Sequence, residues 1–267
     1  MNVVPDPRVY GRSGPWVVVL HGGPGAAGTM APVARRLGTS FRVLEPEQRR
    51  AGAEPLGVER HVADLHALIR RHCPDEPFAL VGHSWGAMLA LAYGAQHPRS
   101  AAALVLVGCG TFDGASRQSL LATRAGRMDE RLHARVAELE RMPDADQRLA
   151  ALGRLYVTVD SVDVAGRDAE IGSCDARAHR ETWADMLRLQ DAGVYPQAFA
   201  AIESPVLMLH GADDPHPGPM IRRSLEEHIP QLEYSELERC GHYPWLEREA
   251  AGEFFELLTV WLTGQFR

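Results

Sequence analysis

The pentapeptide Gly82-His83-Ser84-Trp85-Gly86 lies between an apolar run and a helix-forming run. Residues 78–81 read Phe-Ala-Leu-Val, and residues 87–93 read Ala-Met-Leu-Ala-Leu-Ala-Tyr. Gly-x-Ser-x-Gly between a strand and a helix is typical of a sharp turn with a strained serine at its apex. We expect both glycines to be obligatory, because a side chain there would clash with the neighbouring strand and helix. Such a turn holds the Ser84 hydroxyl out of the sheet, where it can act as a nucleophile.

A second glycine-rich turn follows an earlier apolar run. Residues 16–20 (Trp-Val-Val-Val-Leu) lead directly into His21-Gly22-Gly23-Pro24-Gly25. A loop in this position can supply a backbone N–H to an oxyanion hole, since glycine lets the backbone approach a substrate carbonyl closely. An ordinary tight turn is the alternative, because Gly-Pro clusters are common in loops. The independent nucleophile turn favours the oxyanion interpretation.

Short apolar runs alternate with helical patterns along the chain. Strands are expected at residues 17–20, 41–44, 78–81, 102–108, 205–211 and 232–237, and helices at 29–37, 58–73, 85–97, 220–228 and 249–262. The run at 102–108 is apolar on both sides, as in parallel strands that helices cover on both faces. The pattern predicts an α/β fold with a doubly wound, mostly parallel sheet.

Residues 112–199 interrupt this alternation with amphipathic helical stretches, such as 132–142 and 148–157, and with many charged residues. We predict a core formed by residues 1–111 and 200–267, with a helical cap inserted as residues 112–199. The cap would cover the carboxyl edge of the sheet, where ligands bind in open α/β sheets. Most carboxylates of the cap are expected to face water. They include Asp160, Asp163, Asp168, Glu170 and Glu181.

A serine nucleophile needs a base, and the chain order expected for this fold is Ser, then Asp or Glu, then His. After the strand at 205–211 come two adjacent carboxylates, Asp213 and Asp214, which are both placed for the acid. After the last strand, His242 lies in a loop bounded by Gly241 and Pro244. Of the twelve histidines, only His242 combines the chain order with a loop setting, so we predict that it is the base.

The other histidines are interpreted as structural. His83 is expected to pack beside the nucleophile, and His210 to be buried on a core strand. A partly solvated helix face is expected for His61, His66 and His72. A surface position is expected for His97, His133, His179, His216 and His228.

The composition excludes several classes of partner and cofactor. The formal net charge is −7 and the sequence pI about 5.9, so neither nucleic acid nor an anionic membrane is indicated as a partner. Four scattered cysteines without a Cys-x-x-Cys pair favour free thiols over a zinc site or disulfides. With no visible signal peptide and no apolar run of membrane-spanning length, a cytoplasmic protein is expected.

Taken together, four motifs resemble the α/β-hydrolase superfamily, specifically the subgroup named after prolyl aminopeptidase (proline iminopeptidase). They are His21-Gly22-Gly23-Pro24-Gly25, Gly82-His83-Ser84-Trp85-Gly86, Gly211-Ala212-Asp213-Asp214 and Gly241-His242-Tyr243-Pro244-Trp245. The resemblance implies that Asp214, three residues after the strand-end glycine, is the acid rather than Asp213. It also implies that the backbone N–H groups of Trp85 and Gly23 form the oxyanion hole.

Three departures separate this chain from prolyl aminopeptidases. The subgroup commonly has Asp-Gln-Arg-Gly where this chain has Glu47-Gln48-Arg49-Arg50. It usually has glycine where this chain has His83. It also has a Trp-Glu pair in the cap that grips the substrate's α-amino group, whereas Trp183 here is followed by Ala184. The resemblance therefore carries over the fold and the triad but not the peptidase specificity.

These observations predict a serine hydrolase that forms an acyl-enzyme on a small-molecule ester, lactone or amide. Ser84 would attack the carbonyl, His242 would transfer the proton and Asp214 would orient the imidazole. No metal or cofactor is required. The alternatives are a prolyl aminopeptidase, a biosynthetic thioesterase or acyltransferase with the same triad, and a non-catalytic binding member of the fold.

Overall fold

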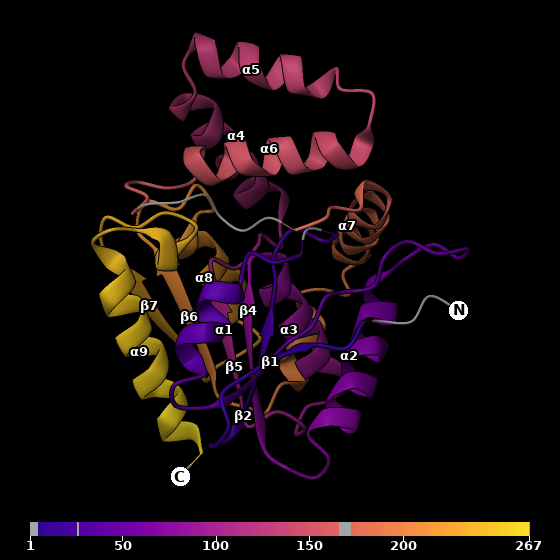
Figure 1. Ribbon diagram of the computed structural model, residues 1–267, viewed down its shortest axis with the longest axis vertical. Coiled ribbons are helices and arrows are strands. Elements are labelled where there is room, and N and C mark those ends of the chain that lie inside the picture. The colour runs from indigo at the N-terminus through magenta and orange to yellow at the C-terminus, as the bar shows by residue number, and fades with distance from the viewer. Residues whose placement is uncertain (1–4, 26, 166–171, 267) are drawn as a thin grey trace.

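A single mixed sheet forms the centre of the molecule. The computed structural model describes residues 5–25, 27–165 and 172–266. Within them the strand order is β1-β3-β2-β4-β5-β6-β7, with β1 antiparallel to β3 and every other pair parallel. The strands are β1 (Arg8–Tyr10), β2 (Trp16–Leu20), β3 (Arg42–Glu45), β4 (Phe78–His83), β5 (Ala103–Val107), β6 (Val206–Gly211) and β7 (Leu232–Leu237). The predicted α/β fold with a doubly wound, mostly parallel sheet is confirmed (Figure 1).

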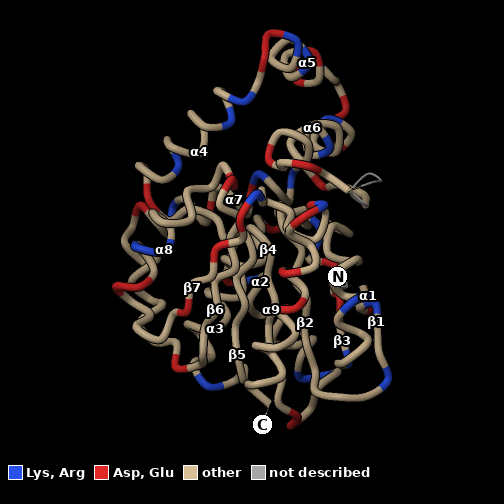
Figure 2. Tube along the Cα trace, turned by 90° about the vertical axis from the view of Figure 1, so that its left-hand side faces the viewer, with Lys and Arg blue, Asp and Glu red and all other residues tan. Residues whose placement is uncertain are grey.

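Helices cover both faces of the sheet. One face packs against α1 (Ala31–Leu37) and α9 (Ala250–Gln265), and the other against α2 (Val58–His72), α3 (Trp85–Gln96) and α8 (Gly218–Glu226). Successive strand residues point to opposite faces, so Val17 and Val19 enter the first core while Val18 and Leu20 enter the second. This double burial explains why the central strands carry no charged residues (Figure 2).

In the part of the chain that the structure describes, four α-helices between β5 and β6 lie over the sheet and are called the cap below (Figure 1). They are α4 (Gly114–Arg127), α5 (Glu130–Glu140), α6 (Ala145–Val159) and α7 (Ala176–Asp191). Each begins after an aspartate whose side chain accepts a backbone N–H in the first turn, which satisfies one of the unpaired donors there. These aspartates are Asp113, Asp129, Asp144 and Asp175.

Among the described strands, β1 is the one that the sequence pattern missed. It is three residues long and lies at the edge of the sheet, so it has neither the length nor the burial that gives a strand its apolar signature. Two short 3₁₀ helices, η1 (Gln197–Ala201) and η2 (Pro244–Leu246), complete the elements. None of the described helices is both long and apolar enough to cross a membrane.

Candidate active site

Ser84 occupies the sharp turn between β4 and α3. Its backbone has φ 53° and ψ −116°, and its N–H donates to the Val107 carbonyl of the neighbouring strand at 2.9 Å. A Cβ added at Gly82 would lie 2.2 Å from the Gly86 carbonyl oxygen, and one added at Gly86 would lie 2.3 Å from the Leu20 oxygen. Both positions therefore require glycine, as predicted, and the close contacts hold the strained serine in place.

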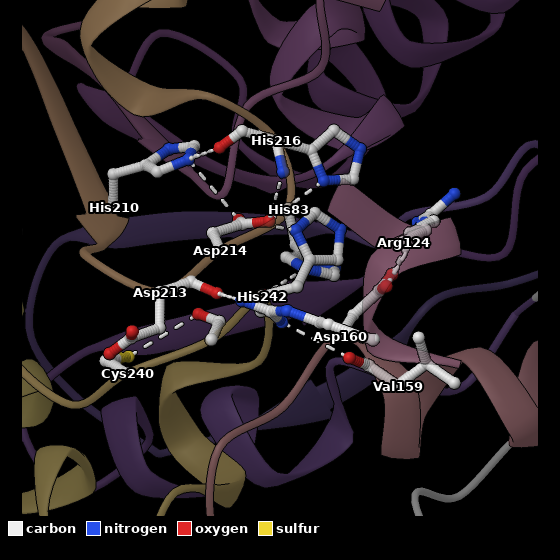
Figure 3. Close-up of polar contacts among 12 residues, drawn as sticks. His83, Arg124, Val159, Asp160, His210, Asp213, Asp214, His216, Cys240 and His242 are labelled. Atoms are coloured by element: carbon white, nitrogen blue, oxygen red, sulfur yellow. Dashed lines mark hydrogen bonds and ion pairs between the residues drawn. The ribbon is translucent and has the colours of Figure 1, made fainter. Parts of the chain in front are cut away.

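His242 and Asp214 meet at the carboxyl ends of β7 and β6 (Figure 3). The His242 Nδ1 donates to Asp214 Oδ2 at 2.7 Å, and both side chains are buried. With Nδ1 carrying the proton, Nε2 has the lone pair that a general base needs. The adjacent Asp213 is exposed instead, so the structure brings Asp214 rather than Asp213 to His242.

One cavity of about 540 Å³ brings the predicted site residues together. Gly23, Ser84, Trp85 and His242 line it, and Asp214 lies behind His242. The cavity is bounded below by the carboxyl edge of the sheet, here called the floor, and above by the cap, here called the roof. The arrangement can support acyl transfer, because a strained serine, an oriented imidazole and two glycine-rich backbone segments share one space.

Gln48 connects the two segments predicted to form the oxyanion hole. Its Oε1 accepts from the Trp85 indole N–H at 2.7 Å, and its Nε2 donates to the His21 carbonyl at 3.0 Å. The Gln48 backbone N–H also donates to His21 Nε2, which leaves His21 Nδ1 to donate to the Gly22 carbonyl. In the sequence, residues 47–50 were noted only as a departure from the prolyl aminopeptidase subgroup. The positioning role of Gln48 was missed.

The Asp214 carboxylate accepts hydrogen bonds from two histidines, His242 and His216. The expectation that His216 lies at the surface is therefore wrong. The backbone N–H and Nδ1 of His216 both donate to Asp214 Oδ1, at 2.8 and 2.9 Å. The chain turns back at Pro215, so that the His216 ring stacks on the His242 ring with centroids 4.2 Å apart. His210, buried as expected, lies 3.4 Å from Asp214 Oδ2 and bonds the His216 carbonyl.

The protonation states of Asp214 and His216 follow from burial and from the neighbouring side chains. Burial by itself raises the pKa of Asp214, but His242, His216 and His210 outweigh it and hold that pKa well below its usual range. Burial lowers the pKa of His216 to about 4, so its imidazole is neutral at pH 7. A neutral His216 donates through Nδ1 and keeps an acceptor, Nε2, while lining the cavity.

Three other expectations about polar side chains need correction. His61 is buried rather than solvated, and its Nε2 lies 2.9 Å from the Thr182 hydroxyl of α7. His179 lines the cavity. Asp160 does not face water: it is fully buried and forms a bidentate ion pair with Arg124 of α4. The packing of the cap buries His61 and Asp160 and places His179 at the cavity, and such tertiary contacts cannot be read from a local sequence pattern.

Asp163 and Glu181, the other expected cap carboxylates that the structure describes, are not among the residues that line the cavity. Asp163 is half-exposed and pairs with Arg248, and Glu181 accepts the Leu56 N–H at 2.9 Å. Asp168 and Glu170 are outside the described residues. His83 packs as predicted: its Nε2 donates to the His242 carbonyl at 2.9 Å.

Glu247 is a positioning residue that the sequence did not reveal. Its buried carboxylate accepts the N–H groups of Val162, Asp163 and Gly241 at 2.8–2.9 Å. It thereby ties the segment after α6 to the loop that carries His242, whose own N–H donates to the Asp160 carbonyl at 2.8 Å. His242 is thus held from the cap side as well as from the sheet.

Among the described residues, one cluster has the ligand types to hold a metal ion: Asp214, His216 and His242. The Nδ1 atoms of both histidines donate to the two oxygens of Asp214. Each nitrogen facing the carboxylate therefore carries a proton, whereas metal binding requires a lone pair there. The three side chains are arranged as a hydrogen-bonded network in which both imidazoles donate to the carboxylate.

Comparison with known proteins identifies the family of the fold. Residues 15–249 match the model of the α/β hydrolase fold. The chain belongs to the α/β-hydrolase fold family. The proline iminopeptidase of Lactobacillus crispatus (strain ST1) is 24% identical over 280 residues, covering 92% of this chain and 89% of the relative. An sn-1-specific diacylglycerol lipase from Mus musculus is 25% identical over 264 residues, covering 93% and 81%.

Solved structures extend the likeness in fold to other hydrolases. The enol-lactonase from Burkholderia xenovorans LB400 superposes with a TM-score of 0.65 at 21% identity, covering 96% of this chain and 95% of the lactonase. The resemblance to the hydrolase superfamily and to proline iminopeptidases is thus confirmed. The matched relatives act on different classes of substrate by name, so likeness alone does not select a substrate.

Proposed function

We propose that this protein is a serine hydrolase that cleaves small-molecule esters or lactones through an acyl-enzyme. The observation that carries the proposal is the 2.7 Å hydrogen bond from His242 Nδ1 to the buried Asp214, with His242 and Ser84 lining the same cavity. Ser84 attacks the carbonyl carbon, and its proton passes to His242 Nε2. Asp214 stabilises the resulting imidazolium and stays ionised.

The later steps use the same groups. The N–H groups of Gly23 and Trp85 stabilise the oxyanion, and His242 returns its proton to the leaving group. Water, which gives a proton to His242, then attacks the acyl-enzyme carbonyl; the bond from the acyl carbon to Ser84 Oγ breaks, His242 returns the proton to Oγ, and the carboxylic acid is released. A thioesterase or acyltransferase would use the same acyl-enzyme and differ in the leaving group or the acceptor.

The cavity favours esters and lactones over peptides with a free amino terminus. An ammonium group is costly to desolvate without an acceptor, so an aminopeptidase needs carboxylates in its substrate pocket. No Asp or Glu is found among the described residues that line this cavity, whereas Arg117 and Arg124 are. The aminopeptidase alternative draws its support from relatives that bear that name.

Two measurements test the proposal. A fluorophosphonate probe should label the native protein on Ser84, with no labelling in Ser84→Ala. A panel of small esters, lactones and prolyl arylamides should show higher kcat/KM for esters or lactones. Labelling at another residue, or undiminished turnover by Ser84→Ala, would refute the mechanism. Faster turnover of the prolyl arylamide, lost on N-acetylation, would restore the aminopeptidase interpretation.

A further inference from the structure

One face of α4 forms part of the roof. Arg117, Leu120, Leu121 and Arg124 all line the cavity. Their spacing of i, i+3, i+4 and i+7 places them along one side of a helix. The roof therefore presents a stripe with an arginine at each end and two leucines between them.

The two arginines differ in how their charge is balanced. Arg124 forms its ion pair with the buried Asp160 and lies 4.9 Å above the Tyr156 ring. Arg117 instead donates through Nη1 to the side-chain oxygen of Gln190 at 2.8 Å. An amide orients a guanidinium without neutralising it. Arg117 is therefore a fixed positive charge at a cavity whose described lining contains no carboxylate.

Gln190 holds Arg117 in a defined place. Its Nε2 donates to the Thr111 carbonyl at 3.0 Å, so its oxygen is directed at Arg117. This contact joins α7, α4 and the segment after β5. A guanidinium has five N–H donors, and the bond to Gln190 uses one of them. The remaining donors match the paired oxygens of a carboxylate.

The position of Arg117 indicates which part of the substrate it meets. Arg124 lies on the His242 side, because its partner Asp160 holds the His242 N–H through the backbone. Arg117 is seven residues earlier on α4, about 10 Å along the axis at 1.5 Å per residue. The leaving group must lie near His242, which protonates it. Arg117 therefore faces the acyl portion of the substrate.

We infer that the substrate is an ester or lactone whose acyl portion carries a second, ionised acid group, and that Arg117 binds that group. The inference rests on the proposed acyl-enzyme function and adds the substrate class. Arg117 is a specificity-determining residue, because it would contact the substrate away from the reacting carbonyl.

Two esters that differ at one end of the acyl chain test this inference. 4-Nitrophenyl hexanoate and the mono-4-nitrophenyl ester of adipic acid have the same leaving group and acyl length, and a carboxylate replaces the terminal methyl group in the second. We expect the native protein to show a kcat/KM for the adipate ester about tenfold to a hundredfold higher, as charge-assisted hydrogen bonds give. Non-enzymatic hydrolysis of each ester is subtracted.

Variants assign the preference to Arg117. Arg117→Gln should lose this preference, because kcat/KM should fall much further for the adipate ester than for the hexanoate ester, and Arg117→Lys should retain part of the preference. Gln190→Glu should also lose it, because the new carboxylate pairs with Arg117. Arg131→Gln, at an exposed position of α5, removes the same charge and should keep the preference. Thermal melting confirms that each variant is folded.

The outcomes separate this inference from the proposed function. If Ser84 is labelled and hexanoate is hydrolysed, but the adipate ester is no better, the carboxylate assignment is wrong and the serine hydrolase stands. A preference that persists in both Arg117→Gln and Gln190→Glu also overturns the assignment. If no ester is hydrolysed and Ser84 is not labelled, both proposals fail.

Discussion

The floor and the roof of the cavity are built in different ways. On the floor, two buried carboxylates each accept three N–H donors: Asp214 from the His242 ring and from the ring and backbone of His216, and Glu247 from three backbone N–H groups. The roof is made of leucines, aromatic rings and two arginines carried on helices whose outer faces are exposed. Asp214 and Glu247 are each fixed by several hydrogen bonds, whereas the Arg117 guanidinium of the roof is held by its bond to Gln190.

This difference separates two tasks. Catalysis requires groups held within a few tenths of an ångström, which multiple hydrogen bonds achieve. Selection requires a surface whose charge and shape match the substrate, which a few side chains on a helix can provide. Substitutions in the floor should therefore alter turnover of every substrate, and substitutions in the roof should alter which substrate is preferred.

The largest effect is expected at Asp214. Asp214→Asn should lower kcat about 10⁴-fold, because the imidazole loses the acceptor that fixes its tautomer. Asp213→Asn, next to it but exposed, should stay within about threefold. Steady-state kinetics on a neutral ester measure both. If the two effects were reversed, the acid would be Asp213.

Asp160→Asn tests the ion pair that joins α4 to the end of α6 within the roof. It leaves Arg124 without its buried partner, and the loss of one member of such a pair costs about 3–5 kcal/mol of unfolding free energy. Asp163→Asn, which breaks a pair whose members are half-exposed, should cost under about 0.5 kcal/mol. Urea denaturation measures both.

The double variant Arg124→Met with Asp160→Asn provides the control. It should recover part of the loss, because no buried charge remains unpaired. Equal stability of Asp160→Asn and Asp163→Asn would show that the ion pair does not secure the cap.

His61 lies at the interface between α2 of the core and α7 of the cap. Burial lowers the pKa of His61 to about 4. Between about pH 4 and pH 6.5, His61 is therefore protonated in the unfolded chain but neutral in the folded protein. The resulting stability is complete above about pH 6.5 and declines as the pH falls toward 4, by up to about 3 kcal/mol. His61→Gln keeps a donor for Thr182 and should show a smaller loss of stability between pH 7 and pH 5.

Urea midpoints at the two pH values measure the effect of His61→Gln. His133→Gln, at an exposed position of α5, should behave like the native protein. An unchanged pH slope in His61→Gln would mean that His61 is protonated in the folded state.

The smallest effect is expected at His216. His216→Ala removes one of the donors to Asp214 and should lower kcat about tenfold with a smaller change in KM. His216→Asn places an amide donor near the same position and should restore most of the activity. A structural role alone would not give this rescue, and an Asn variant as poor as the Ala variant would count against a positioning role.

Part of the floor could be predicted from the sequence because some of its residues obey local rules. Gly82 and Gly86 are required by backbone contacts, and His242 follows a chain order that the sheet topology imposes. His216 could not be recognised, since its importance depends on a turn that brings it back onto Asp214. Arg117 could not be recognised either, because an arginine on an amphipathic helix ordinarily faces water. Only the docking of the cap shows which side of α4 lines the cavity.

The place at which the cap departs from the core has an evolutionary consequence. The chain leaves after β5 and returns at β6, and these two strands are hydrogen-bonded neighbours. A longer, shorter or different set of helices can thus be inserted between them without changing the strand order of the sheet. New selectivity can be acquired by exchanging one continuous stretch of the gene, while the inherited chemistry below is left intact.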